Sequence, residues 1–263
     1  MLGSMLGDLY RRLTRKLFGV EALVQESVAR ELDARVPELM RSEIAALLQS
    51  DGGPRLMLDV EKVANILASV SSAQYFLQHM LLAENLIDRE ALIRFAMKQC
   101  SVEGLVMEFG VYAGRSLRVI AECTPELVYG FDSFEGLPED WTRHQKQGRF
   151  DLEGKLPKFV EPNVRLVRGW FNETLPPFLS QYAGPVRFLH VDCDLYSSAA
   201  TVFTHVGARI VPGTVILFDE YFNYPGWEQH EFRAFQEFVA RSGLKYSYIG
   251  FASSYPSVAV KIT

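Results

Sequence analysis

From residue 104 onwards, short apolar runs alternate with stretches of helical periodicity, and this alternation restricts the possible folds more than any other feature. Strands that are apolar along their whole length are buried on both faces, as in parallel sheets covered by helices. The pattern therefore predicts a Rossmann-like, doubly wound α/β fold with a mostly parallel sheet of seven strands. The predicted strands are Leu105–Val111, Leu127–Asp132, Val164–Trp170, Val186–Asp192, Thr214–Asp219, Lys245–Phe251 and Val258–Ile262.

The connections between these strands predict their directions. Helical stretches such as Ser116–Glu122 and Ser198–Ile210 separate the earlier strands. Only ASSYPS separates the last two strands, and a parallel crossover needs a dozen residues or more. We therefore expect a C-terminal β-hairpin with one antiparallel strand.

The residues before the sheet have a different texture. Leucine and valine recur at steps of three and four between residues 6 and 24, with arginine and lysine between them, which predicts an amphipathic helix. The segment QSDGGPR, Gln49–Arg55, reads as a linker, and Val60–Met80 and Arg89–Lys98 read as helices. We therefore divide the chain into an N-terminal amphipathic helical extension (1–50), a helical cap region (51–100) and the sheet domain (101–263).

Charge and composition limit the partners. The net charge of −5 and the pI of about 5.6 argue against nucleic-acid binding. The sequence shows neither a signal peptide nor an apolar run of about 18 residues. The three cysteines form no CxxC pair, which is typical of a reduced, cytoplasmic protein. The N-terminal helix is expected to join copies of the chain into a homo-oligomer, and peripheral membrane contact through its basic face is the alternative.

Ligands of parallel sheets bind beyond the carboxyl ends of the strands, and three of these ends carry residues suited to a nucleoside. Gly110 and Gly114 flank the turn EFGVYAGRS, where backbone can approach a ligand closely, although a plain tight turn explains them equally. Asp132, 18 residues after Gly114, could accept hydrogen bonds from a ribose, or cap a turn. Trp170 and Phe171 could sandwich a purine, or pack in the core.

Acidic residues follow the next two strands: Asp192 and Asp194 after one, Asp219 and Glu220 after the other. Two carboxylates about 4 Å apart repel by roughly 4 kcal/mol at an effective dielectric constant near 20, so converging acids need a cation or a shared proton. Oxygen ligands favour Mg²⁺, Mn²⁺ or Ca²⁺ over zinc. We favour Asp192 as a metal ligand and Asp194 as the cap of the following helix.

Four side chains are candidates for a general base: Asp192, Asp194, His144 and His230. His190 lies within an apolar strand and is expected to be a satisfied core histidine. The long, charged loop Glu139–Lys155 is expected to act as a lid and to shape an acceptor pocket together with NYPGWEQHEF.

Taken together, these motifs resemble those of class I S-adenosylmethionine-dependent methyltransferases. EFGVYAGRS is similar to the first cofactor motif of catechol O-methyltransferase and its metal-dependent relatives. The ordered set GFDSFEGLP, VRGWFNETLP, HVDCDLYSS and FDEYFNYPGW is closer to the macrocin-type sugar O-methyltransferases of antibiotic pathways. The resemblance covers about residues 80–262.

The resemblance implies a role for each matching residue. The methionine end of the cofactor would contact Glu108, Gly110, Tyr112, Gly114 and Ser116. The ribose would contact Asp132, and the adenine would lie near Ser133, Trp170 and Phe171. Asp192 would lie beside the cofactor and would bind Mg²⁺ together with Asp219 and Glu220. The macrocin-type enzymes usually have two aspartates where this chain has Asp219 and Glu220. Leu195 stands where the catechol enzyme has its lysine base, so the resemblance does not imply that mechanism.

The function that the resemblance implies is a Mg²⁺-dependent O-methyltransferase acting on a sugar hydroxyl of a glycan or glycosylated metabolite. One alternative is methylation of a phenolic small molecule. The other is a non-catalytic scaffold that binds a partner through the N-terminal helix.

Overall fold

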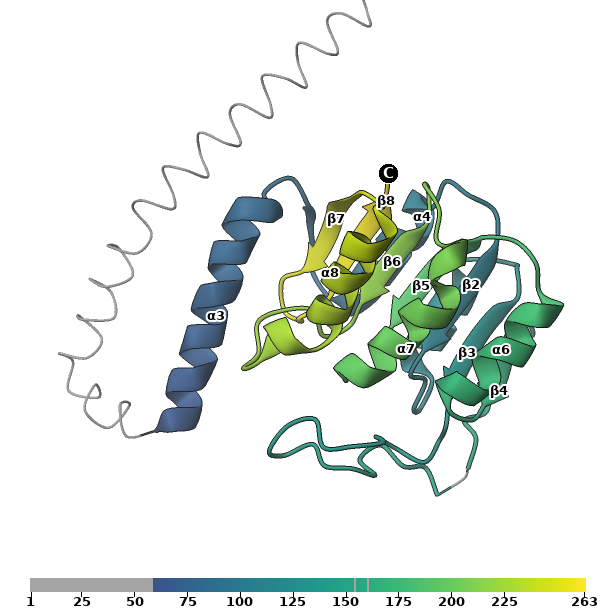
Figure 1. Ribbon diagram of the computed structural model, residues 1–263, viewed down its shortest axis with the longest axis horizontal. Helices are drawn as coiled ribbons and strands as arrows, with labels where there is room; N and C mark the ends of the chain where they lie inside the picture. The colour runs from purple at the N-terminus through teal and green to yellow at the C-terminus, as the bar shows by residue number, and fades with distance from the viewer. Residues whose placement is uncertain (1–58, 154, 160) are drawn as a thin grey trace, which may run out of the picture. The chain divides into compact units, whose positions relative to one another are not determined.

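The computed structural model describes residues 59–153, 155–159 and 161–263 (Figure 1). The predicted N-terminal amphipathic helix and the linker Gln49–Arg55 lie outside the described residues. The chain divides into two compact units, Met1–Leu81 and Leu82–Thr263. In the first unit, the helix α3, Val60–His79, begins after Asp59, whose side chain accepts a hydrogen bond from the backbone N–H of Lys62 at 3.1 Å.

The second unit is built on an eight-stranded sheet, with the order β1-β7-β8-β6-β5-β2-β3-β4 (Figure 1). Neighbouring strands are parallel, except that β8 is antiparallel to both β6 and β7. This arrangement confirms the doubly wound, mostly parallel sheet with a C-terminal hairpin. The strands are β1 (Glu84–Leu86), β2 (Leu105–Phe109), β3 (Val128–Asp132), β4 (Val164–Arg168), β5 (Val186–Val191), β6 (Val215–Phe218), β7 (Tyr246–Ala252) and β8 (Val258–Ile262).

The sheet has one strand more than the seven that the sequence predicts. The additional strand, β1, is three residues long and pairs with β7 at the edge of the sheet. Because Glu84 and Asn85 are exposed, β1 has no apolar run by which it could have been found.

Helices cover both faces of the sheet, which is why its central strands are apolar throughout (Figure 1). On one face, α4 packs on β6, β7 and β8, and α5 packs on β3 and β4; α6, α7 and α8 lie on the other face. Leu92 and Ile93 of α4 and Val106 and Phe188 of the sheet are fully buried in the same core. The helices are α4 (Arg89–Gln99), α5 (Arg115–Glu122), α6 (Phe171–Gln181), α7 (Tyr196–Val206) and α8 (Glu231–Ser242).

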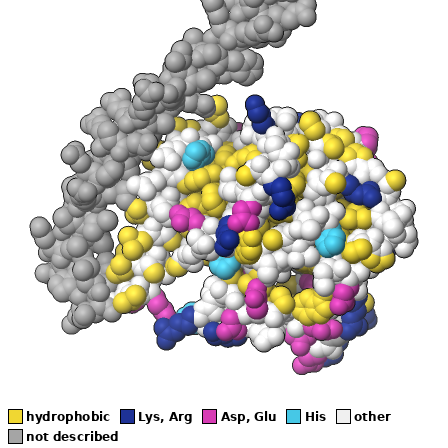
Figure 2. All heavy atoms as spheres, viewed as in Figure 1, with side chains coloured by type: hydrophobic (Ala, Val, Ile, Leu, Met, Phe, Trp, Pro, Cys, Tyr) yellow, Lys and Arg dark blue, Asp and Glu magenta, His cyan; other side chains and the backbone are white. Residues whose placement is uncertain are grey.

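The described surface carries charged side chains of both signs, as the composition of the chain leads one to expect. Figure 2 shows acidic and basic side chains interspersed on the face that it draws. Among the described helices, none is long and apolar enough to cross a membrane.

The strand order brings the ends of β2 and β5 into close contact, and Gly110 makes this contact possible. Its backbone has a φ of +91°, and a Cβ atom at this position would lie 1.6 Å from the carbonyl oxygen of Asp192. The N–H of Asp192 in turn donates to the carbonyl oxygen of Phe109 at 2.9 Å. The loop after β2 is therefore fitted against the backbone of the first acidic residue.

Replacing Gly110 should consequently disrupt this edge of the sheet. We expect Gly110→Ala to lower the free energy of unfolding by at least about 2 kcal/mol, because it adds a backbone clash to a left-handed conformation. Gly184→Ala is the matched control, since Gly184 has a φ of +108° and a Cβ atom there would meet no heavy atom within 4 Å. Urea unfolding of both variants measures the difference, and equal losses would contradict this account.

Candidate active site

A cavity of about 420 Å³ lies at the carboxyl ends of the parallel strands. Its size is typical of a small-ligand site. Its wall contains every residue predicted to contact the cofactor except Glu108, and all three predicted metal ligands. These residues are Gly110, Tyr112, Gly114, Ser116, Asp132, Ser133, Trp170, Phe171, Asp192, Asp219 and Glu220.

The glycine-containing loop after β2 forms one side of this cavity. Tyr112 and Gly114 both have positive φ values, 46° and 77°, and Gly114 directly precedes α5. The Asp132 carboxylate holds the loop, because its Oδ2 accepts hydrogen bonds from the backbone N–H groups of Val111 and Tyr112, each at 2.8 Å. Asp132 thus has a structural role at the cavity, and its contact with a ribose stays a prediction.

The residues predicted to lie near an adenine come from two neighbouring strand ends. Ser133 follows β3, and its Oγ accepts a hydrogen bond from the N–H of Glu135 at 3.1 Å. Trp170 precedes α6 and Phe171 begins it, with the Phe171 ring packed edge-on against Phe109 at 5.2 Å between centroids. The contact with adenine itself stays a prediction.

The acidic residues meet at another part of the cavity wall, after β5 and β6. Asp192, Asp219 and Glu220 each offer an oxygen atom, and these atoms lie within 4.8 Å of one another. Burial, with repulsion from Asp219, raises the pKa of both Asp192 and Glu220. Oε2 of Glu220 is buried without a hydrogen-bond partner among the described residues. This set of oxygen atoms fits a hard divalent cation such as Mg²⁺.

Asp194 belongs to the same acidic group, and the prediction that it caps a helix is wrong. The helix α7 begins two residues later and has no side-chain cap, whereas Asp194 has a φ of +61° and lines the cavity. The N–H of Leu195 donates to the carbonyl oxygen of Cys193 at 2.6 Å, so a tight turn separates Asp194 from the helix. Burial and repulsion from Asp219 raise the pKa of Asp194 to about 7, despite a hydrogen bond with Glu220 that lowers it.

Glu231 supports the acidic loop from behind, a role that the sequence pattern does not predict. It is fully buried at the start of α8, and its Oε1 accepts hydrogen bonds from the backbone N–H groups of Cys193 at 3.1 Å and Asp194 at 3.2 Å. A glutamate in the first turn of a helix is common, so nothing in the sequence distinguishes it.

Arg89 is the second residue that the sequence did not reveal. It begins α4, and its Nη1 lies 2.5 Å from Oδ2 of Asp219 and 3.6 Å from Oδ2 of Asp192. Burial alone would lower its pKa, but attraction to the two carboxylates outweighs burial and raises it. More than a hundred residues separate Arg89 from these aspartates in the sequence, and only the packing of α4 on the sheet brings them together.

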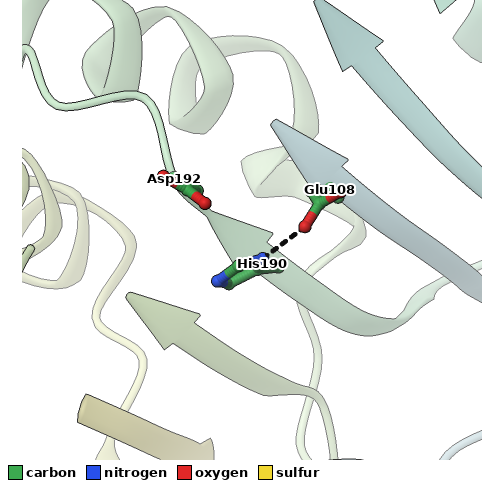
Figure 3. Close-up of side chains that lie close together, drawn as sticks. All are labelled: Glu108, His190 and Asp192. Carbon is green, nitrogen blue, oxygen red and sulfur yellow. Dashed lines mark hydrogen bonds and ion pairs between the residues drawn. The ribbon is translucent and has the colours of Figure 1, made fainter. Parts of the chain in front are cut away.

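Glu108 and His190 form a fully buried pair on neighbouring strands (Figure 3). Oε1 of Glu108 lies 2.7 Å from Nδ1 of His190. Glu108 is therefore outside the cavity wall, and its predicted contact with the methionine end finds no support in this arrangement. His190 is a core histidine as expected but is only half satisfied, because its Nε2 has no hydrogen-bond partner among the described residues and lies 4.0 Å from Oδ1 of Asp219.

The loop predicted to be a lid contributes Trp141, Gln145 and Phe150 to the cavity wall. Glu139 ties it to α7 by accepting a hydrogen bond from the Ser197 hydroxyl at 2.5 Å. Trp141 packs against Tyr224, with 5.8 Å between the ring centroids, so this loop meets the segment NYPGWEQHEF as expected.

The two histidines proposed as general bases lie outside the cavity wall. The ring of His230 packs against Trp141, with 6.3 Å between the ring centroids, and burial lowers the pKa of His230. His144 is exposed on the lid loop. Of the four candidates, only Asp192 and Asp194 line the cavity.

Comparisons with known proteins agree with this geometry. A family model described as a methyltransferase domain matches residues 107–221. An 8-demethyl-8-(2,3-dimethoxy-alpha-L-rhamnosyl)-tetracenomycin-C 4'-O-methyltransferase from Streptomyces olivaceus is 29% identical over 143 residues. This alignment covers 46% of the chain, and the chain spans about half the length of the relative, 54%.

Two solved structures share the fold. CalS11, a calicheamicin methyltransferase, has a TM-score of 0.54 and 20% identity, covering 84% of this chain and 90% of that one. The O-methyltransferase NovP has a TM-score of 0.53 and 22% identity, covering 66% and 79%. The sheet-containing part of the chain thus shares its fold with these two methyltransferases, and the matched methyltransferase-domain model lies within it.

The buried acids predict how the stability of the metal-free protein depends on pH. The pKa of Asp194 is raised from 3.8 to about 7, so its carboxylate costs stability fully above pH 7, and this cost disappears as the pH falls towards 4. We expect Asp194→Asn to be about 1–3 kcal/mol more stable than the unsubstituted protein at pH 8 and to lose this advantage at low pH.

Urea unfolding in EDTA between pH 8 and pH 5 measures this effect. Asp151→Asn, at an exposed loop position, is the matched control and should follow the unsubstituted protein. A constant difference between Asp194→Asn and the unsubstituted protein across this range would contradict the assignment.

Proposed function

We propose that this chain is an S-adenosylmethionine-dependent O-methyltransferase that acts, with the help of Mg²⁺, on a sugar hydroxyl of a glycan or glycosylated metabolite. The observation that carries the proposal is that the glycine loop and the acidic group line one cavity. A cofactor on the loop and an acceptor at the acids would then be neighbours. The sugar O-methyltransferase name of the Streptomyces olivaceus relative supports the choice of acceptor.

The cofactor would lie along the loop after β2. Tyr112, Gly114 and Ser116 would contact its methionine end, because their backbone borders the cavity. The ribose would reach Asp132, whose Oδ1 accepts one hydrogen bond, from the N–H of Phe134, and has room for another. The bound cofactor supplies a methyl group that is already activated by its sulfonium, so the main task of these residues is to hold it in line with the acceptor oxygen.

The acceptor hydroxyl would lie at the acidic side. Asp192, Asp219 and Glu220 would hold the divalent cation, whose chemistry is to lower the pKa of a bound hydroxyl. Asp194 lines the same wall and is placed to take the hydroxyl proton.

The lid would complete the acceptor pocket. The indole Nε1 of Trp141 is buried without a hydrogen-bond partner among the described residues, in a side chain that lines the cavity. It can therefore donate a hydrogen bond to an acceptor oxygen. A sugar carries several hydroxyl oxygens that could accept this hydrogen bond, whereas an apolar ring carries none. The buried indole N–H therefore fits the proposed sugar acceptor better than an apolar acceptor.

Binding of S-adenosylhomocysteine tests the cofactor half of the proposal. Calorimetry should show micromolar binding, weakened at least about tenfold in Asp132→Asn, because the substitution removes charge-assisted acceptors from the loop and the ribose. Asp151→Asn is the matched control and should bind normally. No binding to the unsubstituted protein would contradict the proposal and leave a methyltransferase fold that acts as a scaffold.

Turnover of Asp192→Ala tests the metal half. We expect methyl transfer to fall at least about a hundredfold while affinity for S-adenosylhomocysteine changes less than about threefold, because the acid acts on the acceptor side. The assay compares glycosylated acceptors with catechols, each with Mg²⁺ and with EDTA. Undiminished turnover in the variant would refute the metal site, and turnover of catechols alone would refute the sugar acceptor.

A further inference from the structure

Arg89 occupies a position that its own helix disfavours. It is the first residue of α4, where the helix dipole places partial positive charge. The neighbouring residues follow the usual preference: Asp88 caps the helix by accepting from the N–H of Ala91 at 2.8 Å, and Glu90 lies in its first turn. A cation at this position therefore gains its stabilisation elsewhere, from Asp219 and Asp192.

The Arg89 guanidinium contacts the carboxylates that a metal ion would need. Nη1 lies 2.5 Å from Oδ2 of Asp219 and 3.6 Å from Oδ2 of Asp192, and both residues belong to the metal-ligand set. The side chain is 21% exposed and lies in the cavity wall. A divalent cation on the same carboxylates would be repelled by the guanidinium.

Arg89 does not by itself satisfy the acidic group. Nε2 of His190 is fully buried, lacks a partner among the described residues and lies 4.0 Å from Oδ1 of Asp219. Oε2 of Glu220 is likewise buried without a partner among these residues. When ionised, Asp192, Asp219 and Glu220 carry three negative charges, which one guanidinium does not balance. The group thus retains both polar atoms and charge for a second cation.

We propose that Arg89 is a built-in counter-ion that competes with the divalent cation for Asp219 and Asp192. This inference rests on the proposed function, since it concerns the metal of the proposed reaction. When no metal is bound, Arg89 holds the two carboxylates together; when a metal binds, the guanidinium leaves Asp219. The ring of Tyr255, whose centroid lies 6.0 Å from Cζ of Arg89, offers it a place nearby.

Titration with Mn²⁺ alone, followed by electron paramagnetic resonance, tests the competition without any turnover. We expect Arg89→Gln to bind Mn²⁺ at least about tenfold more tightly than the unsubstituted protein, because one repelling charge is removed from the site. In EDTA, the same variant should have a lower melting temperature, since the acids lose their counter-ion.

Arg94→Gln is the matched control. Arg94 lies on the same helix, half-exposed, and pairs with Glu122 at 2.5 Å, away from the cavity wall. Its Mn²⁺ affinity should equal that of the unsubstituted protein.

Unchanged or weaker Mn²⁺ binding by Arg89→Gln would overturn the proposal, as would the absence of binding in both proteins. Should Arg89→Gln fail to fold, Arg89→Met decides, because it also removes the charge while keeping a long side chain, and it should bind Mn²⁺ at least about tenfold more tightly. S-adenosylhomocysteine binding is measured in parallel. Its absence would refute the proposed function, whereas the Mn²⁺ comparison would still decide the role of Arg89.

Discussion

Repulsion between buried carboxylates is the interaction on which the rest of the site depends. The ends of β5 and β6 bring Asp192, Asp219 and Glu220 within 4.8 Å of one another, with Asp219 buried and the other two half-buried. Such an arrangement is stable only with compensating charge or protons. The fold supplies part of the compensation through Arg89 of α4, and Glu231 fixes the loop between the acids by accepting from its backbone. Both supports come from helix N-terminal residues, one on each face of the sheet.

The topology makes this convergence possible. The strand order reverses at β2, since β3 and β4 follow towards one edge of the sheet and β5 and β6 towards the other. The end of β2 therefore lies between the ends of β3 and β5. Ligands of doubly wound sheets bind where this reversal occurs. Gly110 lets the loop after β2 approach the backbone of Asp192, which joins the proposed cofactor loop to the acidic group. A displacement of either side therefore displaces the other.

The sequence predicted the features that depend on local pattern. Apolar runs revealed the central strands, and glycine and acidic residues at their ends indicated the cavity wall, because parallel strands bring such ends together. It could not predict features that depend on packing. Arg89 reaches Asp219 only because α4 lies on β6–β8, and β1 has no apolar pattern to reveal it. The mistaken prediction of a helix cap at Asp194 shows the same limit. Aspartate suits both a helix cap and a cavity wall, and it is a tight turn that places Asp194 in the cavity wall.

The pair of Glu108 and His190 shows how the core extends the site inward. Glu108 lies one strand away from the acidic group and contacts Nδ1 of His190 (Figure 3). This contact fixes the imidazole, and Nε2 lies 4.0 Å from Oδ1 of Asp219. An uncharged imidazole can carry its proton on only one of its two nitrogens, so the state of this pair decides whether Nε2 donates or accepts. If Nδ1 donates to Glu108, Nε2 is left as an acceptor facing a carboxylate, which a proton or a cation on Asp219 would relieve. In that tautomer, the core adds to the need for positive charge at the acidic group.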